Sequence, residues 1–162
     1  MEFLSQLHPF VVHFPIAAFM LYAVFEVTGI LADNDFILKM AFVLLFIGVI
    51  SSVGAVLTGN QAAEIAVMQN VEWDSLIEKH EDYATITLWY FFAILVFRTY
   101  LVLKKKFSGV LKYIFIPLVL IGSFLIYETG DHGGKLVYDY GIGTKVKQNE
   151  MSNESHSNSE IE

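Results

Sequence analysis

The sequence predicts an all-α fold, an antiparallel four-helix transmembrane bundle, and three observations lead to that prediction. Hydrophobic residues make up 55% of the 162 residues, more than ordinary soluble domains of this size carry. The mean hydropathy is +0.54. The apolar residues gather in four stretches, each near the roughly 20 residues that cross a bilayer as a helix. Soluble helices keep a polar face, so four nearly continuous apolar stretches argue against a soluble bundle.

Polar connections separate the four predicted spans. Only Asp33, Asn34 and Asp35 lie between the first two, which forces an antiparallel helical hairpin. The stretch "KKKFSG" joins the third span to the fourth. A longer polar segment, 59–82, joins the second to the third and is expected to form an outer loop. The predicted spans are residues 11–32, 36–58, 83–103 and 110–127.

Two local patterns predict where helices begin. Pro15 lacks an N–H and clashes with the preceding turn, so the first helix should start late or kink there. Ser75 and Glu78 form the S-x-x-E pattern of a capping box, which predicts that the third helix begins near Ser75, before the membrane.

Small residues recur every four positions along the second span. Such residues let helix backbones approach closely in lipid, so this helix is predicted to pack tightly. The pairs are Gly48 with Ser52, Ser51 with Ala55, and Gly54 with Thr58.

The last residues differ in composition from the four-span membrane domain, which is predicted to cover 1–145. The stretch "QNEMSNESHSNSEIE" is polar and low in aromatic residues. Such a segment cannot bury enough apolar surface to fold, so 146–162 should form a disordered polar tail. No specific role is predicted for His156, which lies within it.

The distribution of Lys and Arg predicts the orientation. Cytoplasmic flanks of membrane helices carry an excess of these residues. Lys79 and Lys135 flank one side of the predicted bundle, and Lys145 and Lys147 lie farther out on that side. The opposite, richer side should be cytoplasmic, which puts both termini outside a bacterial cytoplasmic membrane. That side carries Lys39, Arg98, Lys104, Lys105, Lys106 and Lys112.

Composition and motifs exclude several function classes. The chain has no cysteine, which rules out disulfides, thiolate metal sites and covalent c-type haem attachment. The net charge of −7 argues against nucleic acid as a partner. The sequence contains no G-x-S-x-G, H-E-x-x-H or Walker loop, so no hydrolase or transferase activity is indicated.

Four histidines fall on the same, outward end of the predicted bundle. They are His8 and His13 in "HPFVVHFP", His80 ahead of the third span, and His132 after the fourth. At helical spacing, His80 is the polar member of an otherwise mostly apolar stripe. Around His132, the glycines permit tight turns and close backbone approach. These are Gly130, Gly133 and Gly134.

The histidine cluster has three possible roles, two of which involve a metal because imidazole is the commonest metal ligand. His13 and His80 are the predicted axial ligands of a non-covalent b-type haem, with His8 and His132 as hydrogen-bonding neighbours. A Zn, Cu or Fe ion with histidine and carboxylate ligands is a second possibility. A structural or proton-handling role without a cofactor is the third. The candidate carboxylates are Glu64, Glu78, Glu128 and Asp131.

Two opposite charges lie inside predicted spans, Glu26 in the first and Arg98 in the third. Each is five or six residues from the cytoplasmic end of its span, so their depths match. A charge buried in a membrane is costly unless it is partnered. The sequence therefore predicts an ion pair between them, with independent snorkelling to the interface as the alternative.

Three stretches resemble a family of bacterial membrane proteins known as domain of unknown function 2231 (DUF2231). They are "LHPFVVHFPIA" at 7–17, "HEDYATIT" from His80, and "TGDHGGKLVYDYGIG" at 129–143. The resemblance covers residues 1 to about 145 and implies a four-span integral membrane domain without a settled activity. Some family members look fused to cytochrome-like modules. The signature positions that carry over are His8, His13, His80, Gly133 and Gly134.

Three functions compete at this point. The first is a haem- or metal-binding membrane protein that passes electrons at the outer face to a membrane redox or cytochrome partner. The second is a non-enzymatic scaffold or assembly subunit of a membrane complex. The third is a small transporter or channel. One predicted intramembrane ion pair gives this function little support.

Overall fold

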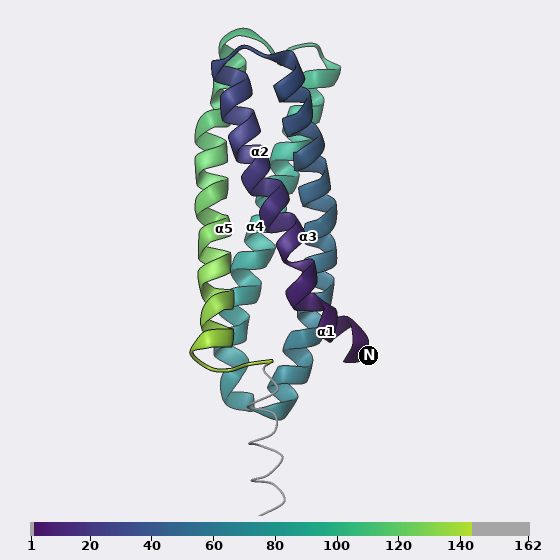
Figure 1. Cartoon of the computed structure of the whole chain (residues 1–162), viewed down its shortest axis with the longest axis vertical. Helices are drawn as coiled ribbons and strands as arrows, with labels where there is room; N and C mark the ends of the chain where they lie inside the picture. Colours follow the sequence, from purple (N-terminus) through teal and green to yellow (C-terminus); the bar gives the residue numbers. More distant parts are fainter. Residues whose placement is uncertain (1, 144–162) are drawn as a thin grey trace, which may run out of the picture.

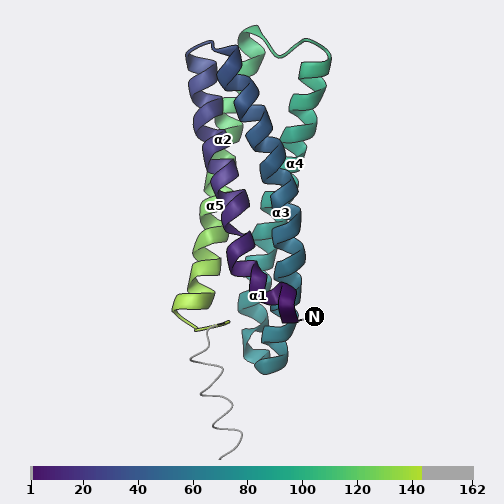
Figure 2. The ribbon, with the colours of Figure 1, turned by 45° about the vertical axis from the view of Figure 1, so that its right-hand side comes forward.

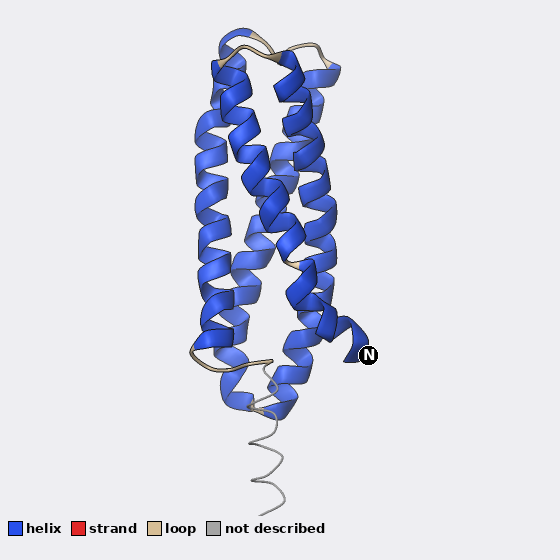
Figure 3. Cartoon of the chain, viewed as in Figure 1, coloured by secondary structure: helices blue, strands red, loops and turns tan. Residues whose placement is uncertain are grey.

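The protein is a long bundle of antiparallel helices, as the sequence predicts (Figure 1). The computed structural model describes residues 2–143 and contains no strand among them. The predicted tail at 146–162, and with it His156, lies outside the described residues. Figure 3 shows that loops are confined to the ends of the bundle, apart from one interruption near the N-terminus. The helices are α1 Glu2–Val11, α2 His13–Leu31, α3 Asp35–Gln69, η1 Val71–Trp73, α4 Asp74–Leu103, η2 Gly109–Ile114 and α5 Phe115–Tyr138.

Four helical segments are long and apolar enough to cross a membrane. Their sides expose many large apolar residues, which a bilayer would cover. Prominent examples are Phe14, Leu57, Trp89, Leu120 and Phe124. The four segments are Ser5–Leu31, Asp35–Gln69, Val71–Leu103 and Gly109–Tyr138.

The two ends of the bundle differ in chemistry. One end carries the connections after α2 and α4; we call it the basic end. There Asn34 caps α3 by accepting from the N–H groups of Phe36 and Ile37 at 3.0 and 3.2 Å. Lys112 of η2 donates to Asp33, which ties the two connections together. The opposite end carries His8, His80 and His132, and we call it the histidine end (Figure 2).

The first helix is interrupted at Val12, between α1 and α2. Pro15 has no N–H to donate to the carbonyl of Val11, four residues earlier, so the helical ladder is broken there. The predicted disturbance near Pro15 is thus present. The helix nevertheless starts earlier than predicted, because α1 continues it toward the N-terminus and packs on α3 (Figures 1 and 2).

The prediction of a polar loop over 59–82 is wrong for most of that segment. Helix α3 continues to Gln69 and α4 begins at Asp74, with only Asn70 and η1 between them. A small apolar cluster holds these helix ends together. It consists of buried Ala66, Trp73 and Ile77, with Ala63, Val67, Leu136 and Ile142 packed against them.

The beginning of α4 also differs in detail from its predicted capping box. The helix starts within one residue of Ser75, but its N-cap is Trp73 and no side chain caps it. Asn70 caps η1, the short helix before α4, where its side chain accepts from the N–H of Glu72 at 2.9 Å.

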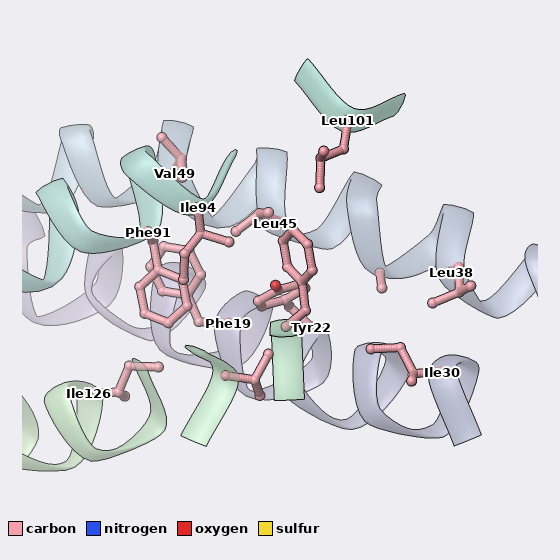
Figure 4. Close-up of a cluster of buried hydrophobic side chains, with 13 residues drawn as sticks. Phe19, Tyr22, Ile30, Leu38, Leu45, Val49, Phe91, Ile94, Leu101 and Ile126 are labelled. Carbon is pink, nitrogen blue, oxygen red and sulfur yellow. The ribbon is translucent and has the colours of Figure 1, made fainter. Parts of the chain in front are cut away.

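The centre of the bundle is a stack of two phenylalanines from different hairpins. The rings of Phe19 and Phe91 lie 3.8 Å apart, centroid to centroid, and are tilted by only 10° (Figure 4). Tyr22 meets Phe91 edge-on at 6.2 Å. All three side chains are almost completely buried. This stack joins α2 to α4, which are not neighbours in the chain.

Two glycines make room for the stack. A Cβ on Gly48 of α3 would overlap the Phe19 ring, and a Cβ on Gly122 of α5 would lie 2.6 Å from Cζ of Phe91. The predicted tight packing of the small-residue helix is therefore present at Gly48. Ser52, Ala55 and Thr58 continue the buried face of α3.

Replacing either glycine by alanine should destabilise the bundle. Gly48→Ala and Gly122→Ala each place a methyl group against a ring that cannot move without disturbing the stack, an overpacking that typically costs about 1–3 kcal/mol. Thermal unfolding in detergent measures the loss. Gly130→Ala is the matched control, because Gly130 is also in α5 but has open space around it. This control should be neutral or slightly stabilising, since Ala favours helix. Equal melting temperatures for all three variants would contradict the packing argument.

Candidate functional site

Three histidines gather at the histidine end from three different helices. His8 is on α1, His80 on α4 and His132 on α5, and all three side chains are half-buried. His80 lies within electrostatic range of both His8 and His132. The topology thus brings together residues that are far apart in the sequence, as expected.

His80 is fixed by the backbone of α5. Its Nδ1 donates to the carbonyl oxygen of Thr129 at 3.1 Å. The carbonyl can only accept, so Nδ1 carries the proton and Nε2 of the neutral ring keeps its lone pair. The side chain of Thr129 in turn bonds Thr87 of α4, with 2.9 Å between the two hydroxyl oxygens. The ring lies against Gly133, where an added Cβ would come within 2.9 Å of its Cε1.

His8 is fixed in the same way by α3. Its Nδ1 lies 3.1 Å from Oγ1 of Thr58. That hydroxyl sits 3.0 Å from the carbonyl oxygens of both Gly54 and Ala55, to which it donates, so it accepts from His8. The His8 ring packs over Gly59, where an added Cβ would come within 3.0 Å of Cε1. Again Nε2 is left as the basic nitrogen.

The other two histidines bond the carbonyls of their own helical turns. His132 donates to the Glu128 carbonyl at 2.8 Å and stacks on Tyr83, with 4.6 Å between ring centroids. His13 donates to the Pro9 carbonyl at 2.6 Å, and its side chain is exposed. His13 therefore lies outside the group that His8, His80 and His132 form, and its predicted pairing with His80 on one iron stays a prediction.

The candidate carboxylates do not complete a many-ligand metal site. Within residues 2–143, no three His, Cys, Asp or Glu side chains gather so as to hold a metal ion. Glu128 lies 3.9 Å from Nδ1 of His132, and Asp131 pairs with Lys135 at 2.5 Å. Glu64 lines a cavity of about 360 Å³ together with Asn60, Ala63, Val67, Met68, Asp74, Ile77 and Glu81, but no histidine. Glu78 is exposed.

The predicted glycine turn is absent. Gly130, Gly133 and Gly134 all lie within α5, which continues to Tyr138. The helix persists because its neighbours pack on it, and at Gly133 the missing side chain accommodates the His80 ring. At that position glycine provides close approach rather than a turn.

Gly59 and Thr129 are parts of this site that the sequence does not single out, and Thr58 is predicted only as a packing residue of the second span. The available signal is the Thr-Gly dipeptide, which occurs at 58–59 and again at 129–130. Each threonine lies within its helix, α3 or α5, toward the histidine end, and an oxygen of each bonds a histidine from another helix.

A second polar group lies between the stacked phenylalanines and the basic end. Arg98 of α4 donates to Glu26 of α2, and both side chains are almost fully buried. Arg98 also donates to the Leu38 carbonyl at 2.8 Å, and its guanidinium lies 4.3 Å from the centroid of the Phe107 ring. Within residues 2–143, Oε2 of Glu26 and Nε of Arg98 have no hydrogen-bond partner, and the buried Tyr22 hydroxyl lies close to the Arg98 guanidinium.

Comparison with known proteins adds one finding. The family model described as "Predicted membrane protein (DUF2231)" matches residues 5–146, which is most of the chain. The chain belongs to the DUF2231 family. No curated protein and no solved structure matches it. This DUF2231 protein is thus a member of a family of predicted membrane proteins, and its four apolar helices agree with that description.

Removing one charge of the buried pair should cost this DUF2231 protein more than removing both. Glu26→Gln or Arg98→Met alone leaves an unpartnered charge in an apolar interior, a loss of about 3–5 kcal/mol by analogy with buried pairs elsewhere. The double variant, Glu26→Gln with Arg98→Met, leaves no unpartnered charge. Folded yield and thermal stability in detergent are the measurements. Lys135→Ala is the control, because its ion pair with Asp131 is partly exposed and such pairs contribute little. Additive losses from the two single changes would contradict the pairing.

Proposed function

We propose that this integral membrane protein binds a transition-metal ion or a b-type haem at the histidine end and passes electrons there to a membrane redox or cytochrome partner. The observation that supports this proposal most is the hydrogen bonding of two imidazoles, from which their protonation follows. His8 and His80 each use Nδ1 to donate to an oxygen of another helix, which leaves Nε2 as a free lone pair.

This arrangement is the one that metal-ligating histidines use. Such histidines almost always donate their other ring N–H to a carbonyl, carboxylate or water, which fixes the tautomer and the ring orientation. Only two imidazoles are needed for axial ligation of a haem iron. The sequence alone favours His13 as the partner of His80, whereas the burial and electrostatic proximity of His8 support His8 in that role.

A second function is favoured by the packing of the same rings. The His8 and His80 rings fill the space over Gly59 and Gly133, so they also hold α1 to α3 and α4 to α5 without any cofactor. Under this alternative the protein is a non-enzymatic scaffold or assembly subunit of a membrane complex, and the histidines are structural.

The orientation completes the proposal. The excess of Lys and Arg around the basic end supports a cytoplasmic position for that end of the bundle. The histidine end and the termini then face outward from a bacterial cytoplasmic membrane.

Absorption spectroscopy with metal analysis tests the cofactor. Full-length protein from haem-replete cells should carry a Soret band that shifts on reduction, or a stoichiometric metal ion. His8→Ala or His80→Ala should abolish it, because each removes one Nε2 ligand. His156→Ala is the control and should leave it unchanged. A parallel His13→Ala variant decides between His8 and His13 as the partner of His80. Colourless, metal-free protein that is still folded in detergent would leave the scaffold role as the better account.

Thiol labelling in intact cells tests the orientation. The natural chain has no cysteine, so single cysteines are clean reporters. A membrane-impermeant maleimide should label Ser5→Cys and spare Ser108→Cys, because these positions lie near opposite ends of the bundle. Labelling of both variants after lysis is the control. The opposite pattern in intact cells would place the histidines in the cytoplasm.

A further inference from the structure

The two hairpins of the bundle repeat the same key positions at the same spacing. The first hairpin consists of α1, α2 and α3, and the second of α4 and α5. On the outgoing helices, Phe19 follows His8 by 11 residues, and Phe91 follows His80 by 11. Glu26 then follows Phe19 by 7 residues, and Arg98 follows Phe91 by 7.

The returning helices repeat as well, and their contacts match. Gly59 follows Gly48 by 11 residues, and Gly133 follows Gly122 by 11. The first glycine of each pair lies against the phenylalanine of its own hairpin, Phe19 or Phe91. The second lies against the histidine of its own hairpin, His8 or His80.

The connections at the basic end complete the equivalence. Asp33 and Lys105 are the two non-glycine residues with positive φ in residues 2–143, at 49° and 53°. Asp33 follows Glu26 by 7 residues, and Lys105 follows Arg98 by 7. L-residues rarely adopt this left-handed conformation, so its recurrence at matching positions indicates that the two hairpins turn in the same way.

Both hairpins start at the histidine end, so a pseudo-twofold axis along the bundle relates them (Figures 1 and 2). Two contacts lie across this axis between equivalent positions. Phe19 stacks on Phe91 at the centre, and Glu26 pairs with Arg98 on the basic side. On the other side of the stack, His8 and His80 lie within electrostatic range of each other. Repeats related by an axis along the membrane normal are known in transporters, where ligands bind at the repeat interface.

We infer that His8 and His80 are the two halves of one binding site on this axis, and that the site takes a single metal-centred ligand held by one Nε2 atom from each hairpin. The inference rests on the proposed function and narrows it to one ligand per chain with two equivalent imidazoles.

His132 has a different role in this arrangement. It follows Gly122 by 10 residues, as Thr58 follows Gly48 by 10, so it occupies the position of Thr58 in the second hairpin. Thr58 bonds the Nδ1 atom of His8, whereas His132 bonds its own helix and stacks on Tyr83. His132 therefore has no equivalent histidine across the axis and is not one of the two ligands.

Titration of the purified full-length chain tests the shared site, with haemin and Cu²⁺ as separate probes. One probe should bind per chain at saturation. His8→Ala and His80→Ala should weaken it equally, on the order of 100-fold, by comparison with the loss that removal of a supporting residue causes. The double variant should bind no more weakly than either single variant, because one lost ligand already breaks the site. His132→Ala and His13→Ala are the controls and should keep the affinity.

The outcomes separate this inference from the proposed function. Two equivalents of probe per chain, or tight binding that survives His8→Ala or His80→Ala, would overturn the shared site and leave the proposed function standing. Binding of neither probe to the folded chain would overturn both.

A second experiment needs no ligand. In the otherwise cysteine-free chain, His8→Cys with His80→Cys should be bridged by a short bis-maleimide, which removes both free thiols while the protein stays monomeric. His13→Cys with His80→Cys is the matched control and should keep two reactive thiols, because the His13 side chain is exposed away from the bundle interior. Bridging of the control pair in place of the first pair would overturn the inference.

Discussion

The stack of Phe19 on Phe91 is the contact on which the rest of the bundle depends. Lipid is as apolar as the helices, so the hydrophobic effect does not drive membrane helices together, and close packing must do so. Two large rings separated by 3.8 Å at the centre satisfy this requirement only if the returning helices carry no side chain beside them. Gly48 and Gly122 meet that condition. The positions of α3 and α5 relative to the stack follow from it.

The buried ion pair fixes how the packed helices are rotated about their own axes. In an apolar bundle, many rotations of a helix cost similar energy, but a rotation that separates Glu26 from Arg98 exposes a charge to lipid. Arg98 has further partners in the Leu38 carbonyl and the Phe107 ring, so its position is overdetermined. The pair also makes the two hairpins different at equivalent positions. Two identical hairpins would place like charges together there, whereas one acid and one base attract.

The sequence predicts the spans and their connections because these depend on composition and length, which are local properties. It also indicates the depth of Glu26 and Arg98, since counting residues along a helix gives depth directly. It predicts the start of α4 near Ser75 but not the extension of α3 to Gln69, because the stabilising cluster around Trp73 combines α3, α4 and the end of α5. The glycines at 130–134 suggest a turn because the sequence does not show their distant neighbours. In the structure Gly133 lies in a helix, and its missing side chain leaves room for the His80 ring.

The candidate site shows the same limit more sharply. Topology alone places four histidines at one end, but helix phase decides which of them meet. The interruption at Val12 changes the phase of the first helix between His8 and His13, so spacing from the transmembrane part does not reveal that His13 is exposed while His8 is half-buried. The repeat at 11- and 7-residue spacing does carry this information. His8, not His13, stands at the same distance from its phenylalanine as His80 does.

The proposed shared site would link ligand binding to assembly of the bundle. Each hairpin contributes one histidine, and each ring is oriented by an oxygen and a glycine of its own returning helix. Under this proposal, a hairpin on its own offers a single oriented ligand and would bind a metal more weakly than the assembled bundle. Only after the phenylalanines stack and the ion pair forms do two imidazoles lie on one axis. A ligand that binds only this assembled state stabilises it in proportion to the logarithm of its concentration over its Kd. The same hydrogen bonds that hold the histidines in the packing would favour the proposed ligation, because a ring that is already held in place loses little freedom when it binds a metal.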